Sequence, residues 1–165
     1  MNKLLIEMTA YCGLFCRDCL RYESEVIDKA KSLLSALEER KFDQYAEAKM
    51  QFDSSFEDYP LFIVLLKKII ALECKKSCRQ GGGCSAFDCP ILKCCLEKQY
   101  EGCWQCERLT DCDKFDFLKP FHGENPQKNC IDLRNNGFDN FDLRKRAFYV
   151  WDERPGMNYK NSKKP

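Results

Sequence analysis

Histidine is almost absent from this sequence: His122 is the single one among 165 residues. A Ser-His-Asp triad needs a histidine beside its nucleophile, and zinc sites that activate water draw most of their ligands from histidine. The chain therefore has almost no material for either kind of chemistry, and we assign no catalytic residue. We expect a protein that is not an enzyme, with His122 in a packing or surface role.

The sequence also lacks an excess of either charge. Its 27 lysines and arginines nearly balance 26 aspartates and glutamates, which gives a formal net charge of +1. Proteins that bind nucleic acids or anionic membranes usually carry a clear basic excess. The composition argues against a nucleic-acid partner. The basic run Arg144-Lys145-Arg146 keeps a nucleic-acid-binding adaptor only as the third functional hypothesis.

Long apolar runs are missing as well. The longest, Leu61–Leu66, is followed directly by two lysines and is far too short to cross a bilayer. At the N-terminus the apolar stretch is short and is interrupted by Glu7, unlike the apolar core of a signal peptide. We therefore expect a cytoplasmic protein with no membrane partner.

Cysteine, by contrast, is abundant: the chain has 13, and nine of them lie between Cys74 and Cys112. Thiols remain reduced in the cytoplasm, so dense cysteine spacing there indicates metal ligands more often than disulfides. The odd number also fits poorly with complete disulfide pairing. We predict that the segment Cys74–Cys112 is a metal-bound hub around which the rest of the chain folds.

Outside this segment the hydrophobic pattern is that of helices. Apolar residues recur at spacings of three and four over residues 23–41, and a second helix is predicted over 42–52. Asp58-Tyr59-Pro60 opens a third helix, which is apolar over more than half its circumference and is predicted to be the central buried helix. Further helices are predicted over 91–98, over 107–118, from Asn125-Pro126 to a stop at Gly137, and over 140–154.

The fold class that follows is mainly α: a small single domain of helices around irregular, cysteine-rich metal-binding loops. The domain is expected to cover residues 1–154, with a polar, basic tail at 155–165. Residues 1–11 are expected to form an irregular lead-in or a strand. The third helix is expected to carry Cys74 and Cys78 at its end, one turn apart, with both thiols on one face.

Twelve of the cysteines fall into three groups whose spacing suits metal coordination. A Cys-x2-Cys loop supplies two ligands from one tight turn, and zinc takes four ligands at tetrahedral positions. Twelve thiolates would fill three four-cysteine sites, whereas two sites would leave four thiols over, and both counts remain open. The predicted ligands are Cys12, Cys16, Cys19, Cys74, Cys78, Cys84, Cys89, Cys94, Cys95, Cys103, Cys106 and Cys112.

The N-terminal triplet Cys12–Cys19 needs a fourth ligand from elsewhere in the chain. We expect it to borrow a thiol from the central segment, with Cys84 and Cys89 or Cys74 and Cys78 as candidates. Cys94 and Cys95 are neighbours on a predicted helix and point in different directions, so they are not expected to share one metal. Trp104, between two thiols, is expected to shield a site from water.

The order of the cysteine blocks resembles that of one protein family. CGLFCRDC, a helical insert, then CKKSC, GGGC, CPILKCC, GCWQC and Cys112 resemble the domain of unknown function 3795 family, a cysteine-rich group of bacteria and archaea. The resemblance covers roughly residues 9–137, including FHGENPQKNC and LRNNGF. It implies metal binding, with zinc as the presumed metal, and it supplies no catalytic residue.

Two classes of metal-dependent function remain open. A closed four-thiolate zinc site has no position for a substrate, which favours a structural zinc protein that serves as an interaction or regulatory module for an unidentified protein partner. The alternative is an iron–sulfur redox or electron-transfer module with a 4Fe-4S cluster. Cys12-x3-Cys16-x2-Cys19 resembles the cluster motif of radical S-adenosylmethionine enzymes, and Cys89-Pro90 resembles the end of ferredoxin cluster runs. The strand–helix alternation of the radical enzymes is missing, which disfavours radical chemistry.

Overall fold

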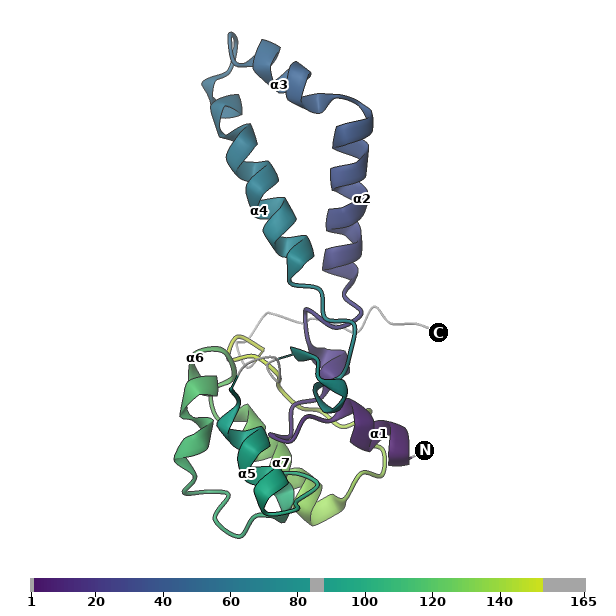
Figure 1. The fold of residues 1–165 in the computed structure, drawn as a ribbon, viewed down its shortest axis with the longest axis vertical. Coiled ribbons are helices and arrows are strands. Elements are labelled where there is room, and N and C mark those ends of the chain that lie inside the picture. Colours follow the sequence, from purple (N-terminus) through teal and green to yellow (C-terminus); the bar gives the residue numbers. More distant parts are fainter. Residues whose placement is uncertain (1, 84–87, 153–165) are drawn as a thin grey trace. The chain divides into compact units, whose positions relative to one another are not determined.

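The computed structural model describes residues 2–83 and 88–152 (Figure 1). The chain divides into two compact units: a cysteine-rich unit formed by Met1–Cys19 and Lys76–Pro165, and a hairpin unit formed by Leu20–Lys75. The described residues are mainly helical, and their only β-structure is two isolated bridges, which confirms the predicted mainly α class. No helix within the described ranges is long and apolar enough to span a membrane. The expected single domain over 1–154 stays a prediction.

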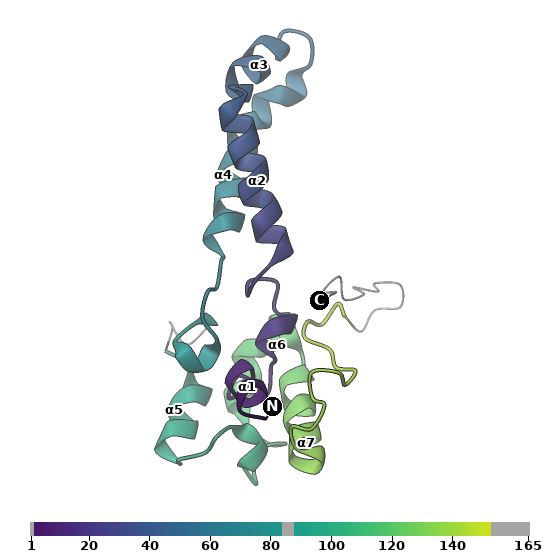
Figure 2. The ribbon, with the colours of Figure 1, turned by 90° about the vertical axis from the view of Figure 1, so that its right-hand side faces the viewer.

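The hairpin unit is built on two antiparallel helices. They are α2 (Glu25–Glu39) and α4 (Tyr59–Ala71), which α3 (Phe42–Lys49) and the 3₁₀ helix η2 (Ser54–Asp58) join at the tip. Lys31 pairs with Glu73 at 2.6 Å, so the start of α2 lies beside the end of α4. Figures 1 and 2 both show the two helices side by side. The three helices predicted between residues 23 and 72 are thereby confirmed.

Local chemistry sets the ends of these helices. Lys41 adopts the left-handed backbone conformation (φ 51°), which ends α2 and turns the chain into α3. The Asp53 carboxylate accepts hydrogen bonds from the amide of Ser55 (3.0 Å) and from its hydroxyl (2.7 Å), which starts η2. Pro60 lies in the first turn of α4, where a missing N–H costs no helical hydrogen bond.

α4 is not the central buried helix that its apolar pattern predicts. Leu66 is its one buried residue, whereas Leu61 and Leu65 are 56% and 51% exposed. In a hairpin each helix is covered mainly on the side that faces its neighbour, so apolar residues on the other sides remain exposed. The prediction was wrong because a sequence pattern does not reveal how many helices surround a given one.

The expected placement of Cys74 and Cys78 on one helical face is also wrong. α4 ends at Ala71, and the amide of Cys74 donates to the carbonyl of Arg21 (2.8 Å) instead of continuing a helix. Cys74 therefore belongs to the hairpin unit. Cys78 begins the 3₁₀ helix η3 (Cys78–Gln80) in the cysteine-rich unit, where Ser77 and Gln80 form a capping box.

The cysteine-rich unit is assembled from short helical pieces. They are α1 (Asn2–Met8), η1 (Cys16–Asp18), η3, α5 (Pro90–Glu97), η5 (Cys103–Gln105), η6 (Asp113–Leu118), α6 (Lys119–His122) and α7 (Asn125–Asn136). The helix predicted over 91–98 is confirmed by α5. The predicted stop at Gly137 is confirmed at the end of α7, and Pro126 lies in the first turn of that helix.

Three predicted segments of this unit differ from the structure. The expected lead-in or strand at the N-terminus is the helix α1. Helical structure within 107–118 begins only at Asp113, as the 3₁₀ helix η6. No described residue of the predicted helix 140–154 is helical; residues 153 and 154, like the tail 155–165, lie outside the described residues.

Arg144 gives the physical reason for the missing last helix. Its guanidinium donates to the carbonyls of Asn136 (3.3 Å), Gly137 (2.5 Å) and Asp139 (2.8 Å), and pairs with Asp132 at 2.5 Å. These bonds fold the segment back on the end of α7. Phe141 and Phe148 of this segment are nevertheless buried.

The core that supports the N-terminal cysteines is aromatic. Phe15 and Phe141 are buried and meet edge to face, with ring centroids 5.8 Å apart. The guanidinium of Arg146 lies over both rings, 4.4 Å and 4.9 Å from their centroids. It pairs with Asp18 through two contacts, of 2.6 Å and 3.1 Å. This arrangement fixes η1 and hence the backbone of the Cys12–Cys19 triplet.

Candidate functional site

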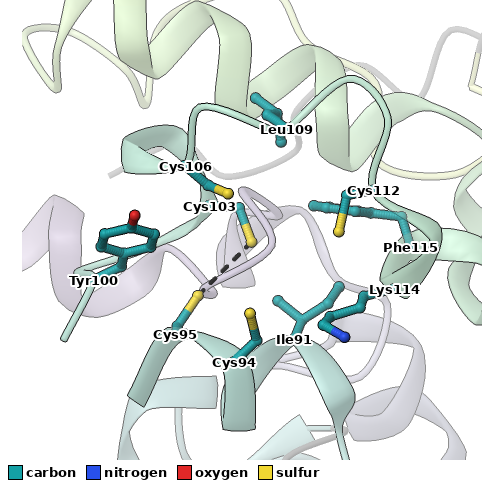
Figure 3. Close-up of a pocket in the computed structure, with 10 residues that line it drawn as sticks. All are labelled: Ile91, Cys94, Cys95, Tyr100, Cys103, Cys106, Leu109, Cys112, Lys114 and Phe115. Carbon is teal, nitrogen blue, oxygen red and sulfur yellow. Dashed lines mark hydrogen bonds between the residues drawn. The ribbon is translucent and has the colours of Figure 1, made fainter. Parts of the chain in front are cut away.

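Five thiols line one small cavity in the cysteine-rich unit (Figure 3). The cavity measures about 20 Å³, and its cysteines are Cys94, Cys95, Cys103, Cys106 and Cys112. Figure 3 shows their sulfur atoms directed toward the same space. Ile91, Leu109 and Phe115 close the cavity and are themselves buried. The site is therefore rich in soft donors and has apolar walls.

Three elements bring these thiols together. α5 supplies Cys94 and Cys95, the turn of η5 supplies Cys103 and Cys106, and Cys112 caps the start of η6. α5 begins at Pro90, whose fixed backbone angle suits a first helical turn. The neighbours Cys94 and Cys95 were expected to point in different directions, yet both line this cavity, because it lies against the end of α5.

The Cys103–Cys106 turn is held by the rest of the unit. The amide of Cys103 donates to the carbonyl of Tyr11 (2.8 Å). From α7, Arg134 donates through Nε to the carbonyl of Trp104 (2.9 Å) and through Nη2 to the carbonyl of Cys106. The thiols of Cys103 and Cys106 therefore project from a turn whose backbone carbonyls accept hydrogen bonds from the Arg134 guanidinium.

Trp104, within this turn, is buried, and its expected shielding of a metal site stays a prediction. Its ring meets that of Phe138 edge to face, at 5.3 Å between centroids. A Cβ at Gly102 would lie 2.2 Å from the Trp104 ring, so only glycine fits before the turn. Phe138 and Gly102 thus hold the Trp104 ring, which does not line the cavity.

A second arginine ties three segments together beside the site. Arg79 donates through Nε to the carbonyls of Ile6 (2.7 Å) and Thr9 (2.8 Å), and through Nη2 to that of Glu101 (2.5 Å). Its guanidinium also lies over the Tyr11 ring, 4.4 Å from the centroid. Arg79 and Arg134 were not identified from the sequence, where nothing distinguishes them from other arginines except the position of Arg79 beside Cys78.

Cys95 and Cys103 are in direct contact, with their sulfur atoms 3.7 Å apart. The hydrogen bond between them lowers the pKa of Cys95, and the positive charge of Arg79 acts in the same direction. The same bond, together with burial, raises the pKa of Cys103. The contact thus moves the two pKa values apart, with the lower one at Cys95.

A second, smaller cavity of about 10 Å³ gathers cysteines that are far apart in the sequence. Cys12, Cys78 and Cys89 line it together with Tyr11 and several apolar residues. Cys12 of the N-terminal triplet thus meets the central segment here, while the expected sharing of a metal ligand stays a prediction. Gly13, next to Cys12, allows a close approach to α7 instead: its φ is +85°, and a Cβ there would lie 2.7 Å from the sulfur of Cys130.

The other predicted ligands lie outside both cavities. Cys16 begins η1 and Cys19 follows its end, and the hydroxyl of Tyr149 donates to the sulfur of Cys19 (3.8 Å). Cys74 is in the hairpin unit, and Cys84 falls outside the described residues. No disulfide joins any of the twelve described cysteines. Within the same ranges, no three Cys, His, Asp or Glu side chains are grouped closely enough to hold a metal ion.

His122 lies among aromatic rings rather than among thiols. Its Nδ1 is 2.6 Å from the carbonyl oxygen of Phe148, and its ring stacks on that of Tyr149 at 5.3 Å. Burial lowers the pKa of His122. These contacts give the single histidine the packing role expected from the sequence.

The fold and the site define a mainly helical, cysteine-rich protein whose thiols gather around small, apolar-walled cavities. The family model described as a protein of unknown function, DUF3795, matches residues 8–117, about two thirds of the chain. The chain belongs to this DUF3795 family. The match ends before FHGENPQKNC and LRNNGF, so the resemblance of those stretches stays a prediction. Searches of curated proteins and of solved structures found no match.

Proposed function

We propose that the cysteine-rich unit binds zinc structurally and that the folded, metal-bound unit serves as an interaction module for a protein partner. Four of the five thiols around the larger cavity would hold one zinc ion. Bound there, zinc would supply a rigid tetrahedral junction between α5, the η5 turn and the start of η6. The chain's own residues orient the donors: Arg134 fixes the turn, and Trp104 excludes water from its outer side.

The distance between the Cys95 and Cys103 sulfurs carries this proposal. A tetrahedral zinc site with Zn–S bonds of about 2.3 Å has sulfur atoms about 3.8 Å apart along each edge. The observed separation is 3.7 Å. Two thiols from different elements, α5 and η5, therefore already have the spacing of one edge of such a tetrahedron. A metal must draw the remaining thiols in, since the described side chains do not yet form a closed ligand set.

Cavity size and donor number favour a single ion over a cluster. A volume of about 20 Å³ is sufficient for roughly one water-sized body. In a 4Fe-4S cluster each thiolate binds a different iron, so its sulfurs lie much farther apart than those of one tetrahedral ion. The close Cys95–Cys103 pair thus supports zinc, and the iron–sulfur module becomes the alternative outcome of the test.

The smaller cavity supports a second zinc site, with three of its ligands assigned. Cys12, Cys78 and Cys89 line it, and a fourth ligand would complete the coordination. This site would join the N-terminal segment to the central one. Four-thiolate zinc leaves no position for a substrate, and thiolates persist in reducing compartments, so a non-catalytic role in the cytoplasm fits the proposal best.

Elemental analysis combined with a cysteine scan tests the proposal. Protein purified anaerobically should be colourless and contain zinc. Serine substitution of each of the five thiols of the larger cavity should remove one zinc equivalent in four cases and leave it in the fifth. Cys130→Ala is the matched control, because Cys130 is buried but lines neither cavity. Brown protein containing iron and sulfide, or a scan in which no substitution removes zinc, would overturn the assignment.

A further inference from the structure

The hairpin unit has very little core of its own. Its buried side chains, within 56 residues, are Tyr22, Ile27, Ala30, Ala46 and Leu66. Units below about 70 residues are marginal unless a metal, a disulfide or a partner adds to a small core. The unit contains one cysteine, Cys74, so neither a disulfide nor a metal site of its own is at hand. A partner that covers its apolar surface would supply the missing stability.

Large apolar side chains are exposed in rows along both long helices. On α4 the exposed residues Phe62, Leu65 and Ile69 recur at spacings of three and four, and on α2 Val26 and Leu33 recur at seven. Such spacings place each set on one face of its helix. The exposed fractions range from 38% for Ile69 to 54% for Val26.

Both rows lie on the same side of the hairpin. On each helix, every residue of the exposed row comes directly before a less exposed residue of the seam between the helices. On α2 the seam residues are Ile27 and Leu34, which follow Val26 and Leu33. On α4 they are Ile63, Leu66 and Ile70, which follow Phe62, Leu65 and Ile69. One residue corresponds to about 100° around a helix. Because the helices are antiparallel and face each other, the same step in both leads to the same side. We call the surface formed by Val26, Leu33, Phe62, Leu65 and Ile69 the open face.

Charge is distributed unevenly along the hairpin. Residues 38–58 at the tip carry seven acidic and three basic side chains, whereas residues 20–37 and 59–75 carry six basic and four acidic ones. Examples are Asp43 and Glu47 on α3 and Lys67 and Lys68 on α4, all exposed. A second hairpin placed antiparallel would bring the acidic tip of each copy to the basic part of the other.

We propose that the open face is the interface between two copies of this chain, which pair their hairpins antiparallel to form a four-helix bundle. Two antiparallel helices with one bare apolar face are half of such a bundle. A two-fold interface requires a surface that complements itself, which the opposite charges of tip and base provide. The interface would cover the rows that the hairpin cannot cover alone. It lies in the hairpin unit and does not depend on the proposed zinc site.

The mass of the full-length protein in solution tests this proposal. Sedimentation is measured over a wide concentration range with a non-thiol reductant present, so that no intermolecular disulfide contributes. The wild type should reach twice the chain mass of 19.4 kDa. Leu65→Glu combined with Ile69→Glu should raise the dissociation constant at least about a hundredfold, because four carboxylates would be buried in the symmetric interface. Leu143→Glu is the matched control, at an exposed leucine of the other unit.

Charge reversal tests the antiparallel arrangement. The double variant Lys67→Glu with Lys68→Glu should weaken the dimer about fivefold, and so should Asp43→Lys with Glu47→Lys. Each double variant places like charges opposite each other wherever the tip of one copy meets the base of the other, which happens twice in the symmetric dimer. The four substitutions together should restore the wild-type dissociation constant. In a parallel pair the like-charged ends already meet, so reversing one end would change little.

Each result decides the proposal. A single-chain mass at every concentration, or a two-chain mass retained by the Leu65/Ile69 variant, would overturn it. Failure of the combined charge variant to restore the dimer would overturn the antiparallel arrangement. If circular dichroism shows that the Leu65/Ile69 variant has lost its helices, the charge variants decide, since they alter exposed side chains alone.

Discussion

The two units of this chain are stabilised in different ways. The hairpin unit has one cysteine and two helices of 15 and 13 residues, held by periodic apolar residues. The cysteine-rich unit contains the other twelve cysteines, and its longest described helix, α7, has 12 residues. Individual bonds from Arg79, Arg134, Arg144 and Arg146 to backbone or carboxylate groups hold its short pieces in place. The regular spacing of apolar residues specifies the hairpin unit, whereas hydrogen bonds and ion pairs of individual arginines specify the cysteine-rich unit.

Metal removal should produce the largest difference in stability between the two units. Structural zinc typically contributes about 10–16 kcal/mol of binding free energy, which exceeds the net stability of most domains. Chelation should therefore unfold the region around Cys74–Cys112, while α2 and α4 keep their structure. Hydrogen exchange followed by mass spectrometry would show lost protection in 76–152 and retained protection in 25–71. Unchanged protection in both units after complete zinc removal would contradict the prediction.

Gly13→Ala should produce the next largest effect, also in the cysteine-rich unit. A left-handed alanine costs about 1–2 kcal/mol, and the added Cβ would meet the sulfur of Cys130 at 2.7 Å. We expect a loss of about 4 kcal/mol in the free energy of unfolding, measured by denaturant titration. Gly81→Ala is the control: its φ is +84°, but no atom lies within 4 Å of the new Cβ. Equal losses in the two variants would refute the role of the close contact.

Leu66→Ala should have a moderate effect, confined to the hairpin unit. Leu66 is 5% exposed, and truncation of a buried leucine leaves a cavity that costs about 3 kcal/mol. Val64→Ala, at a residue that is 48% exposed on another side of α4, should cost less than about 0.5 kcal/mol. Local unfolding by hydrogen exchange measures both. Protection lost equally in the cysteine-rich unit would show that the two units unfold together.

The smallest effect is a dependence of stability on pH through His122. Burial lowers its pKa, although the Phe148 carbonyl and Asp152 act in the opposite direction. As the pH falls below the ordinary histidine pKa of about 6.5, the unfolded chain takes up a proton that the folded chain resists. Stability should therefore fall from pH 6.5 toward the lowered folded pKa, by at most about 1.4 kcal/mol at pH 5.5.

His122→Asn isolates this contribution. The asparagine amide can still donate to the Phe148 carbonyl, but it does not titrate. Denaturant titrations at pH 7.5 and pH 5.5 should give the wild type a steeper loss than the variant. A difference of the opposite sign would mean that the folded chain binds the proton more readily than the unfolded one.

Sequence patterns predicted most of the helices because helix formation is local. The spacing of Leu34 and Leu37, the left-handed Lys41 and the proline at the start of α4 act within a few residues of one another. Burial of α4 could not be predicted, since it depends on how many helices surround it. The last predicted helix failed for another reason: Arg144 binds the carbonyls of Asn136 and Gly137, eight and seven residues before it, and such single side-chain bonds leave no periodic signal in the sequence.

The sequence identified the cysteines of the candidate site but not which of them lie together. The spacing of Cys103 and Cys106 identified a turn with two ligands, and the ligand count indicated that Cys12 would meet the central segment. The grouping of Cys94 and Cys95 with Cys112 depends on how α5 and η6 pack, which no local pattern encodes. The same holds for Arg134, which binds the Cys103–Cys106 turn from 28 residues away.

The closed base of the hairpin unit has a consequence for how this chain can vary. The amide of Cys74 donates to the carbonyl of Arg21, and a parallel bridge joins Tyr22 to Cys74, so both ends of the unit are held side by side. An inserted segment whose two ends are adjacent can be lengthened, shortened or replaced without moving the chain on either side of it. Residues 20–75 therefore form an insertion that can be exchanged as a whole. Relatives with hairpins of other lengths, or a synthetic chain with a short glycine linker in its place, should retain the same cysteine framework.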